Sequence, residues 1–142
     1  MNNLPALIVC FVFAALALWH FYMASRPMSG ETGAVPSVGG KPLFVPSRKS
    51  TVAVGLVLAL FAGLVAATGG LVSVGMPATV LSWLSYALAI GLLARAVGEF
   101  RYVGFFKRVR GSRFAALDTW VYSPLCLLLA AGVGVVAMRD VG

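Results

Sequence analysis

The sequence is poor in charged residues. Of its 142 residues, 11% are charged and only four are acidic, whereas 61% are hydrophobic. A soluble globular domain has about a quarter of its residues charged, and a chain this short has too small an interior to bury so much apolar surface. The composition therefore excludes an ordinary soluble domain and predicts that lipid surrounds much of the chain.

The residues that usually carry catalysis or metal binding are also scarce. The chain has one histidine, His20, and two cysteines, Cys10 and Cys126, without C-x-x-C spacing. It has no nucleophile motif, phosphate loop or metal triad, so we expect no metal and no cofactor. At about 1.5 Å per helical residue the two thiols lie about 9 Å apart in depth, beyond the ~7 Å that a disulfide spans.

Four segments are each long enough to cross a bilayer as a helix, which takes about 20 residues. They cover residues 4–23, 51–72, 78–97 and 117–138. The alternation of a membrane β-barrel is absent. The first segment is similar to a signal peptide, but no Lys or Arg precedes it, so we interpret it as a retained helix. The sequence predicts an all-α fold, a single membrane domain formed by a four-transmembrane-helix bundle.

The basic residues predict the orientation of these helices. Most Lys and Arg residues lie in the loops 25–50 and 98–116, while Arg139 stands alone on the other side. Positively charged loops stay in the cytoplasm, so we expect both termini on the non-cytoplasmic side. Topology then explains the net charge of +7, and without a binding motif we expect no nucleic-acid partner.

The loop 25–50 is rich in proline and glycine, which prevent a long helix. One interpretation is a flexible connector. The other is a lid, because Leu43, Phe44 and Val45 are apolar and suited to fold back against the bundle. The sequence leaves both interpretations open.

Small residues recur every four positions in segment two, at Gly55, Ala59, Gly63 and Ala67. Such a face lets helix backbones approach closely in lipid. We interpret it as a packing feature.

Several polar residues are expected at one depth, near the cytoplasmic interface. This candidate cluster consists of His20, Tyr22, Arg95, Glu99, Asp118, Tyr122 and Cys126. In segments three and four, small residues such as Ala87, Gly91, Ala130 and Gly134 share the helix face of the polar residues. Because small residues mark helix contacts, the polar groups are predicted to point into the bundle.

Two interpretations of this cluster stay open. In the structural one, Arg95 pairs with Glu99 at the end of segment three, and Asp118 caps segment four. In the functional one, the cluster is a binding pocket or an acid–base site, in which His20 suits proton transfer because its charge changes near physiological pH.

Ser123-Pro124 also permits two interpretations. Either Ser123 caps a helix that begins at Pro124, or the helix begins near Asp118 and is kinked by the proline. The sequence does not decide between them.

The second basic loop interleaves aromatic and cationic residues. Its cations include Lys107, Arg108, Arg110 and Arg113. This pattern predicts contact with the anionic headgroups of the bilayer, with rings dipping into the lipid.

Several short motifs follow one another along nearly the whole chain. They are His20-Phe21-Tyr22, Pro46-Ser47, residues 95–101 (RAVGEFR), residues 103–107 (VGFFK), Phe114, Asp118-Thr119 and residues 122–126 (YSPLC). With these motifs the sequence resembles a family of small bacterial membrane proteins known as domain of unknown function 3995. The resemblance implies a multi-pass protein of the bacterial inner membrane and implies no activity.

Two function classes follow from these observations. The first is a small binding protein that holds a lipid-like ligand or a membrane protein partner at the polar cluster. The alternative is a membrane-embedded enzyme that performs acid–base chemistry on a lipid-soluble substrate. The sequence leaves open whether several copies form a homo-oligomer.

Overall fold

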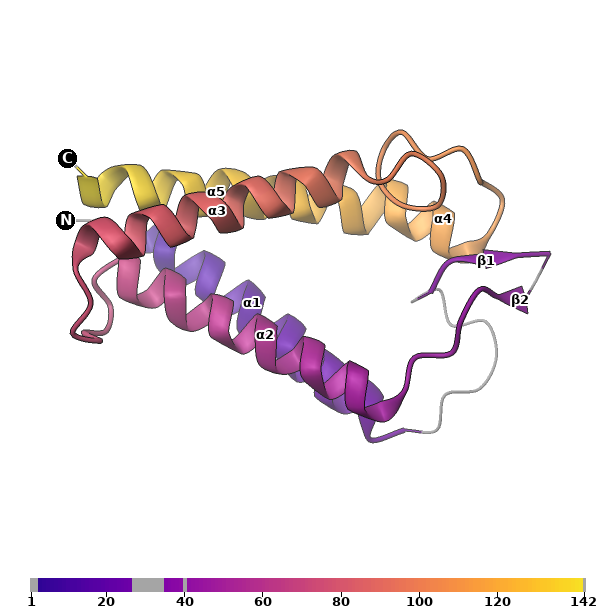
Figure 1. Cartoon of the computed structure of the whole chain (residues 1–142), viewed down its shortest axis with the longest axis horizontal. Coiled ribbons are helices and arrows are strands. Elements are labelled where there is room, and N and C mark those ends of the chain that lie inside the picture. The colour runs from indigo at the N-terminus through magenta and orange to yellow at the C-terminus, as the bar shows by residue number, and fades with distance from the viewer. Residues whose placement is uncertain (1–2, 27–34, 40, 142) are drawn as a thin grey trace.

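The computed structural model describes residues 3–26, 35–39 and 41–141 (Figure 1). It contains four helices that are long and apolar enough to cross a membrane. They span Leu4–Ala24, Arg48–Thr68, Ala78–Val97 and Arg113–Arg139. The prediction of a mostly helical fold with four helices long and apolar enough to cross a membrane is confirmed, while the orientation of the termini stays a prediction.

The first three spans are the helices α1 (Leu4–Ala24), α2 (Arg48–Thr68) and α3 (Ala78–Val97). Helix α2 begins earlier than the sequence predicts because the Ser47 side chain accepts the backbone N–H of Ser50 at 3.1 Å and so caps the helix. It ends at Thr68, where Gly69 and Gly70 follow and Gly70 has a φ of 72°. A left-handed glycine ends a helix readily.

The fourth span is one continuous helix with an irregular turn. It consists of α4 (Arg113–Leu117), a π-helical turn η1 (Asp118–Tyr122) and α5 (Ser123–Val141). Ser112 caps α4 by accepting the Ala115 N–H at 3.0 Å, so neither Ser123 nor Asp118 is the cap. In the π turn the Ser123 N–H donates to the Asp118 carbonyl, directly before Pro124, which has no N–H to donate.

The first basic loop carries a small hairpin, with strand β1 (Ser37–Val38) antiparallel to β2 (Lys41–Pro42). Ser37 lies opposite Pro42. Leu43, Phe44 and Val45, the apolar residues of the lid interpretation, are 45%, 57% and 69% exposed. In the described part of the loop these three side chains therefore do not cover the bundle. Residues 27–34 and 40 lie outside the described residues.

The helices pack as two pairs, α1 with α2 and α3 with α5 (Figure 1). We call the end where α1 begins and α5 finishes the terminal end, and the opposite end the loop end. The pairs meet toward the terminal end, where Gly69 lies against Ala6 and Val136, and Gly132 lies against Val9. The Thr68 and Ser85 hydroxyls form a buried hydrogen bond of 2.8 Å between α2 and α3.

The hydrophobic core also sits toward the terminal end. It consists of Ala6, Val9, Phe13, Val65, Leu88, Leu129, Val133 and Val136. Toward the loop end the two pairs diverge (Figure 1). Leu16, Leu58, Leu92 and Leu125 are only partly buried at the edge of the core. Each helix therefore contributes at least one partly buried leucine beside the core.

The small residues contribute less to helix packing than the sequence predicts. Gly55 contacts Phe21, and Ala67 is buried, but Ala59 and Gly63 between them are exposed. On α3, Ala87 and Gly91 are exposed as well, because the buried face of that helix is the one with Ser85, Leu88 and Ala96. The prediction that Ala87 and Gly91 point into the bundle is wrong.

The contact of Gly132 with Val9 makes a prediction about how the pairs are joined. A Cβ atom at Gly132 would lie 2.7 Å from Val9 Cγ2, whereas one at Gly134 would meet nothing within 4 Å. We expect Gly132→Val to lower the free energy of unfolding by about 1–3 kcal/mol through overpacking. The measurement is SDS-induced unfolding of the purified protein. The matched control is Gly134→Val, and an equal loss in both variants would contradict the packing.

Candidate functional site

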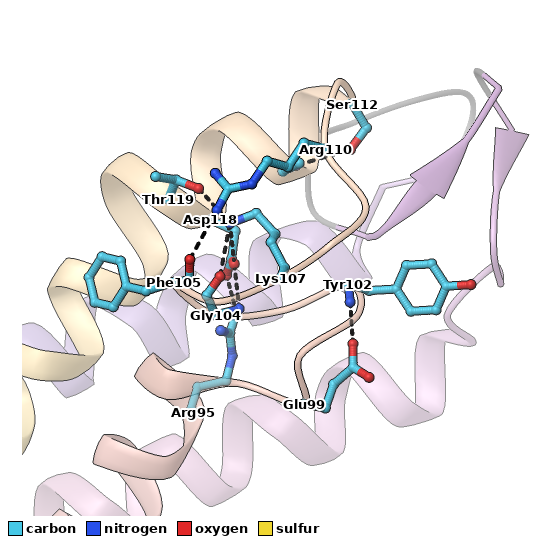
Figure 2. A network of polar contacts seen from close by, with 11 residues as sticks. Arg95, Glu99, Tyr102, Gly104, Phe105, Lys107, Arg110, Ser112, Asp118 and Thr119 are labelled. Atoms are coloured by element: carbon cyan, nitrogen blue, oxygen red, sulfur yellow. Dashed lines mark hydrogen bonds and ion pairs between the residues drawn. The ribbon is translucent and has the colours of Figure 1, made fainter.

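The candidate site is built around the carboxylate of Asp118, which is fully buried in the π turn. Its Oδ1 accepts from Arg95 Nη2 at 2.8 Å, and its Oδ2 accepts from the Gly104 N–H at 2.6 Å and from Lys107 Nζ at 3.1 Å (Figure 2). The three donors come from helix α3 and from residues 98–112, which we call the basic loop. One carboxylate therefore ties that loop to two helices.

Lys107 is the second charged group of this network. Its side chain is fully buried, and its ammonium donates to Asp118, to the Gly104 carbonyl at 3.0 Å and to the Thr119 hydroxyl. An ammonium has three N–H donors, and here each has an acceptor. The cost of burying the Lys107 charge is thus offset by an ion pair and a full set of hydrogen bonds.

The basic loop reaches Asp118 because its backbone crosses itself closely. Gly98 and Gly104 have φ values of 89° and 91°, and a Cβ atom on either one would collide with the backbone of the other segment. The Phe105 N–H donates to the Ala96 carbonyl at 2.9 Å beside this crossing. Only glycine fits both the left-handed conformation and the close approach.

Arg95 is less completely paired than Lys107. The guanidinium lies in the last turn of α3, and its side chain is 35% exposed. Its Nη2 binds Asp118, but Nη1 is buried and has no hydrogen-bond partner among the described residues. The hydroxyl of Ser123, on the turn after Asp118, is likewise buried without a partner in that part of the chain.

Glu99 is not the partner of Arg95, so that prediction is wrong. The Glu99 carboxylate is exposed and accepts the backbone N–H of Tyr102, away from Asp118 (Figure 2). The physical reason is the turn at Gly98, whose positive φ ends the helix before Glu99 reaches the position four residues along the same face.

Lys107 was predicted to contact anionic headgroups, and this must be corrected because its ammonium is buried in the network. Arg108, Arg110 and Arg113 are exposed, so their contact with headgroups stays a prediction. Arg110 also donates to the Phe105 carbonyl at 3.1 Å.

The structure places His20 and Tyr22 on α1, outside the Asp118 network. His20 Nδ1 lies 2.8 Å from the Leu16 carbonyl of its own helix. Because a carbonyl only accepts, this nitrogen carries the proton. Tyr22 is exposed, with its ring 5.6 Å from that of Trp19 and Arg26 over its face. An amphipathic ring in this position is typical of a membrane interface.

Tyr122 and Cys126 follow Asp118 along the fourth helix. The Tyr122 ring lies 5.8 Å from that of Phe114, and Cys126 is a partly buried free thiol. Of the predicted cluster, the structure thus joins Arg95 directly to Asp118 and keeps Tyr122 and Cys126 on the adjoining turns.

Sequence reasoning missed the roles of Gly98, Gly104 and Thr119. A recognisable signal was present in the glycine pair, since Gly98 follows the last helical residue and Gly104 stands beside two aromatic residues. The path of the loop decides which backbone atoms the two glycines bring together. The spacing of the glycines in the sequence does not predict that path.

The chemistry available to the network is ionic. Arg95 and Lys107 carry two positive charges against the single negative charge of Asp118, which leaves a formal excess of one positive charge. Within the described ranges, no three His, Cys, Asp or Glu residues lie close enough to hold a metal ion. The arrangement can hold the basic loop in place and can attract an anion.

Removal of the central carboxylate tests the role of the network. We expect Asp118→Asn to lower the free energy of unfolding by about 3–5 kcal/mol, because two cations lose their compensating charge. SDS-induced unfolding provides the measurement. Glu99→Gln is the matched control, since it removes an exposed carboxylate of the same region, and its effect should stay below about 1 kcal/mol. Equal losses would mean that Asp118 is no more important than Glu99.

The glycine crossing makes a separate prediction. We expect Gly104→Ala to displace the basic loop from Asp118. Gly111 also has a positive φ, of 100°, but a Cβ atom there would meet nothing within 4 Å, so Gly111→Ala should leave the loop in place. Both variants carry about 1–2 kcal/mol of left-handed strain, so their difference reports the close approach. We expect trypsin to cut Gly104→Ala faster at Arg101 and Arg108. Similar cleavage rates in the two variants would contradict the close approach of Gly98 and Gly104.

Comparison with known proteins identifies the family of the chain. The family described as Protein of unknown function (DUF3995) matches residues 13–133, which include all of α2 and α3, parts of α1 and of the fourth helix, and the whole Asp118 network. No curated protein and no solved structure matches the chain. The match covers most of the sequence, so the chain belongs to the DUF3995 family of proteins of unknown function.

Proposed function

We propose that this protein is a small membrane-embedded binding protein that holds a lipid-like molecule between its two helix pairs, at the loop end. The observation that supports the proposal is the partly buried leucines, Leu92 and Leu125, that lie between the core and the Asp118 network on helix pairs that diverge toward the loop end (Figure 1). With the basic loops on the cytoplasmic side, the ligand belongs to the cytoplasmic leaflet of a bacterial inner membrane.

The order of apolar and charged residues along α3 and the fourth helix supports an amphiphilic ligand. Along α3, Leu88 belongs to the core, Leu92 is packed at its edge and Arg95 follows. A spacing of four and then three residues keeps these side chains on one helix face. On the fourth helix Leu129 belongs to the core, Leu125 is packed at its edge, and Asp118 lies seven residues before Leu125, in the π turn nearer the loop end. Along both helices the residues change from apolar to charged toward the loop end. A lipid has the same order, from its apolar chain to its polar headgroup.

Lipid is the expected occupant of such a region on physical grounds. Helices in a bilayer gain little from burying apolar side chains against one another, because the acyl chains are equally apolar. Two pairs that touch at one end therefore have no hydrophobic reason to close at the other. A protein partner of the same amphipathic character is the competing occupant.

The enzyme interpretation receives less support from the geometry. An acid–base site needs its donors and acceptors within hydrogen-bond reach of one substrate. His20 is bonded to its own helix, Glu99 is exposed, and Asp118 is engaged by three donors. The network holds charges in place, which suits binding more than proton transfer.

Native mass spectrometry of protein extracted with its lipids tests the proposal. We expect a stoichiometric lipid on the wild-type protein and at least tenfold less on Leu92→Trp, whose larger side chain takes up the space of an acyl chain. Leu93→Trp is the matched control because Leu93 is 47% exposed and lies on another face of α3. Wild-type protein without any retained lipid would refute the proposal, and so would equal retention in the two variants.

A further inference from the structure

The charge of the Asp118 network bears on the charge of the head group that a ligand would carry. Arg95 and Lys107 share the single carboxylate of Asp118, so the network has one excess positive charge, and Arg95 is the cation that is partly exposed and not fully hydrogen-bonded. No second carboxylate of the described residues joins the network to balance this excess, because the nearby Glu99 is directed toward the Tyr102 backbone (Figure 2). A cation held at the edge of a low-dielectric region attracts an anion strongly.

The hydrogen bonding of Arg95 agrees with the charge. Nη2 is used by Asp118, while Nη1 has no acceptor. The side chain as a whole is 35% exposed, although Nη1 itself is buried. A guanidinium binds planar or tetrahedral oxyanions with two parallel donors. The buried Ser123 hydroxyl, also without a partner among the described residues, is a second unused polar group on the turn next to Asp118.

We propose that Arg95 binds the acidic head group, a phosphate or carboxylate, of an anionic lipid whose chain lies along Leu92, at the edge of the core. This inference rests on the proposed function and adds the chemical class of the ligand. The head group would complete the network as a second anion, so that two cations face two anions. The apolar residues that follow Arg95 toward the core favour a lipid over a free phosphate ion.

The test compares lipids that differ only in charge. Wild-type protein in an uncharged detergent is titrated with phosphatidylglycerol and with phosphatidylcholine of the same acyl chains, and bound lipid is counted by native mass spectrometry. We expect phosphatidylglycerol to bind about tenfold more tightly, and Arg95→Gln to abolish that preference. Arg108→Gln is the matched control, since it removes an exposed positive charge from the adjoining basic loop. It should leave the preference unchanged.

A measurement on the wild-type chain covers the case in which Arg95→Gln does not fold. Phenylglyoxal modifies accessible guanidinium groups, and the modified residues are mapped by mass spectrometry of peptides. We expect phosphatidylglycerol, but not phosphatidylcholine, to protect Arg95 at least severalfold while Arg108 stays reactive. Equal protection of Arg95 by both lipids would overturn the inference.

The outcomes separate the two proposals. Binding of both lipids with equal affinity overturns the assignment of an acidic head group and leaves the lipid-binding function standing. Binding of neither lipid overturns the function itself. The protection experiment is repeated with inorganic phosphate. If phosphate alone protects Arg95 from phenylglyoxal as well as phosphatidylglycerol does, the site takes a soluble anion and the lipid assignment is wrong.

Discussion

The buried carboxylate of Asp118 is the constraint on which the loop end of this protein depends. It receives hydrogen bonds from Arg95, Gly104 and Lys107, and so it joins α3, the basic loop and the fourth helix at one point. In a bilayer an unpaired ionised group is expensive, so these charges are tolerated only together. The position of the loop and the contact between the two helices therefore depend on the same carboxylate, and loss of Asp118 would leave both cations unpaired.

The two ends of the molecule are held together by different forces. Toward the terminal end the pairs meet through close packing at Gly69 and Gly132 and through the hydrogen bond between Thr68 and Ser85. Toward the loop end the contacts lie within each pair, as in Gly55 against Phe21 and Arg95 with Asp118. Because lipid competes with apolar helix contacts, the small and polar groups add to the apolar core in joining the two pairs.

The proposed ligand connects both observations. The diverging pairs provide apolar faces, and the network provides an unbalanced cation at the end of those faces. A binding protein of this kind needs no catalytic group, which agrees with the scarcity of histidine and acidic residues in the chain. The exposed arginines of the basic loop would hold the protein against an anionic membrane surface and raise the local concentration of acidic lipids near Arg95.

The sequence by itself determined the four membrane helices, because length and apolar composition alone set what a bilayer accepts. It also identified Arg95 and Asp118 as polar residues at the same end of the bundle, since each stands near the end of a span. Only the tertiary structure decided that Arg95 pairs with Asp118, that Glu99 turns away and that Lys107 is buried. These choices depend on the path of the basic loop, which the contact between Gly98 and Gly104 fixes. Spacing along a helix predicts which residues share a face, but it does not predict which groups a folded loop brings back to them.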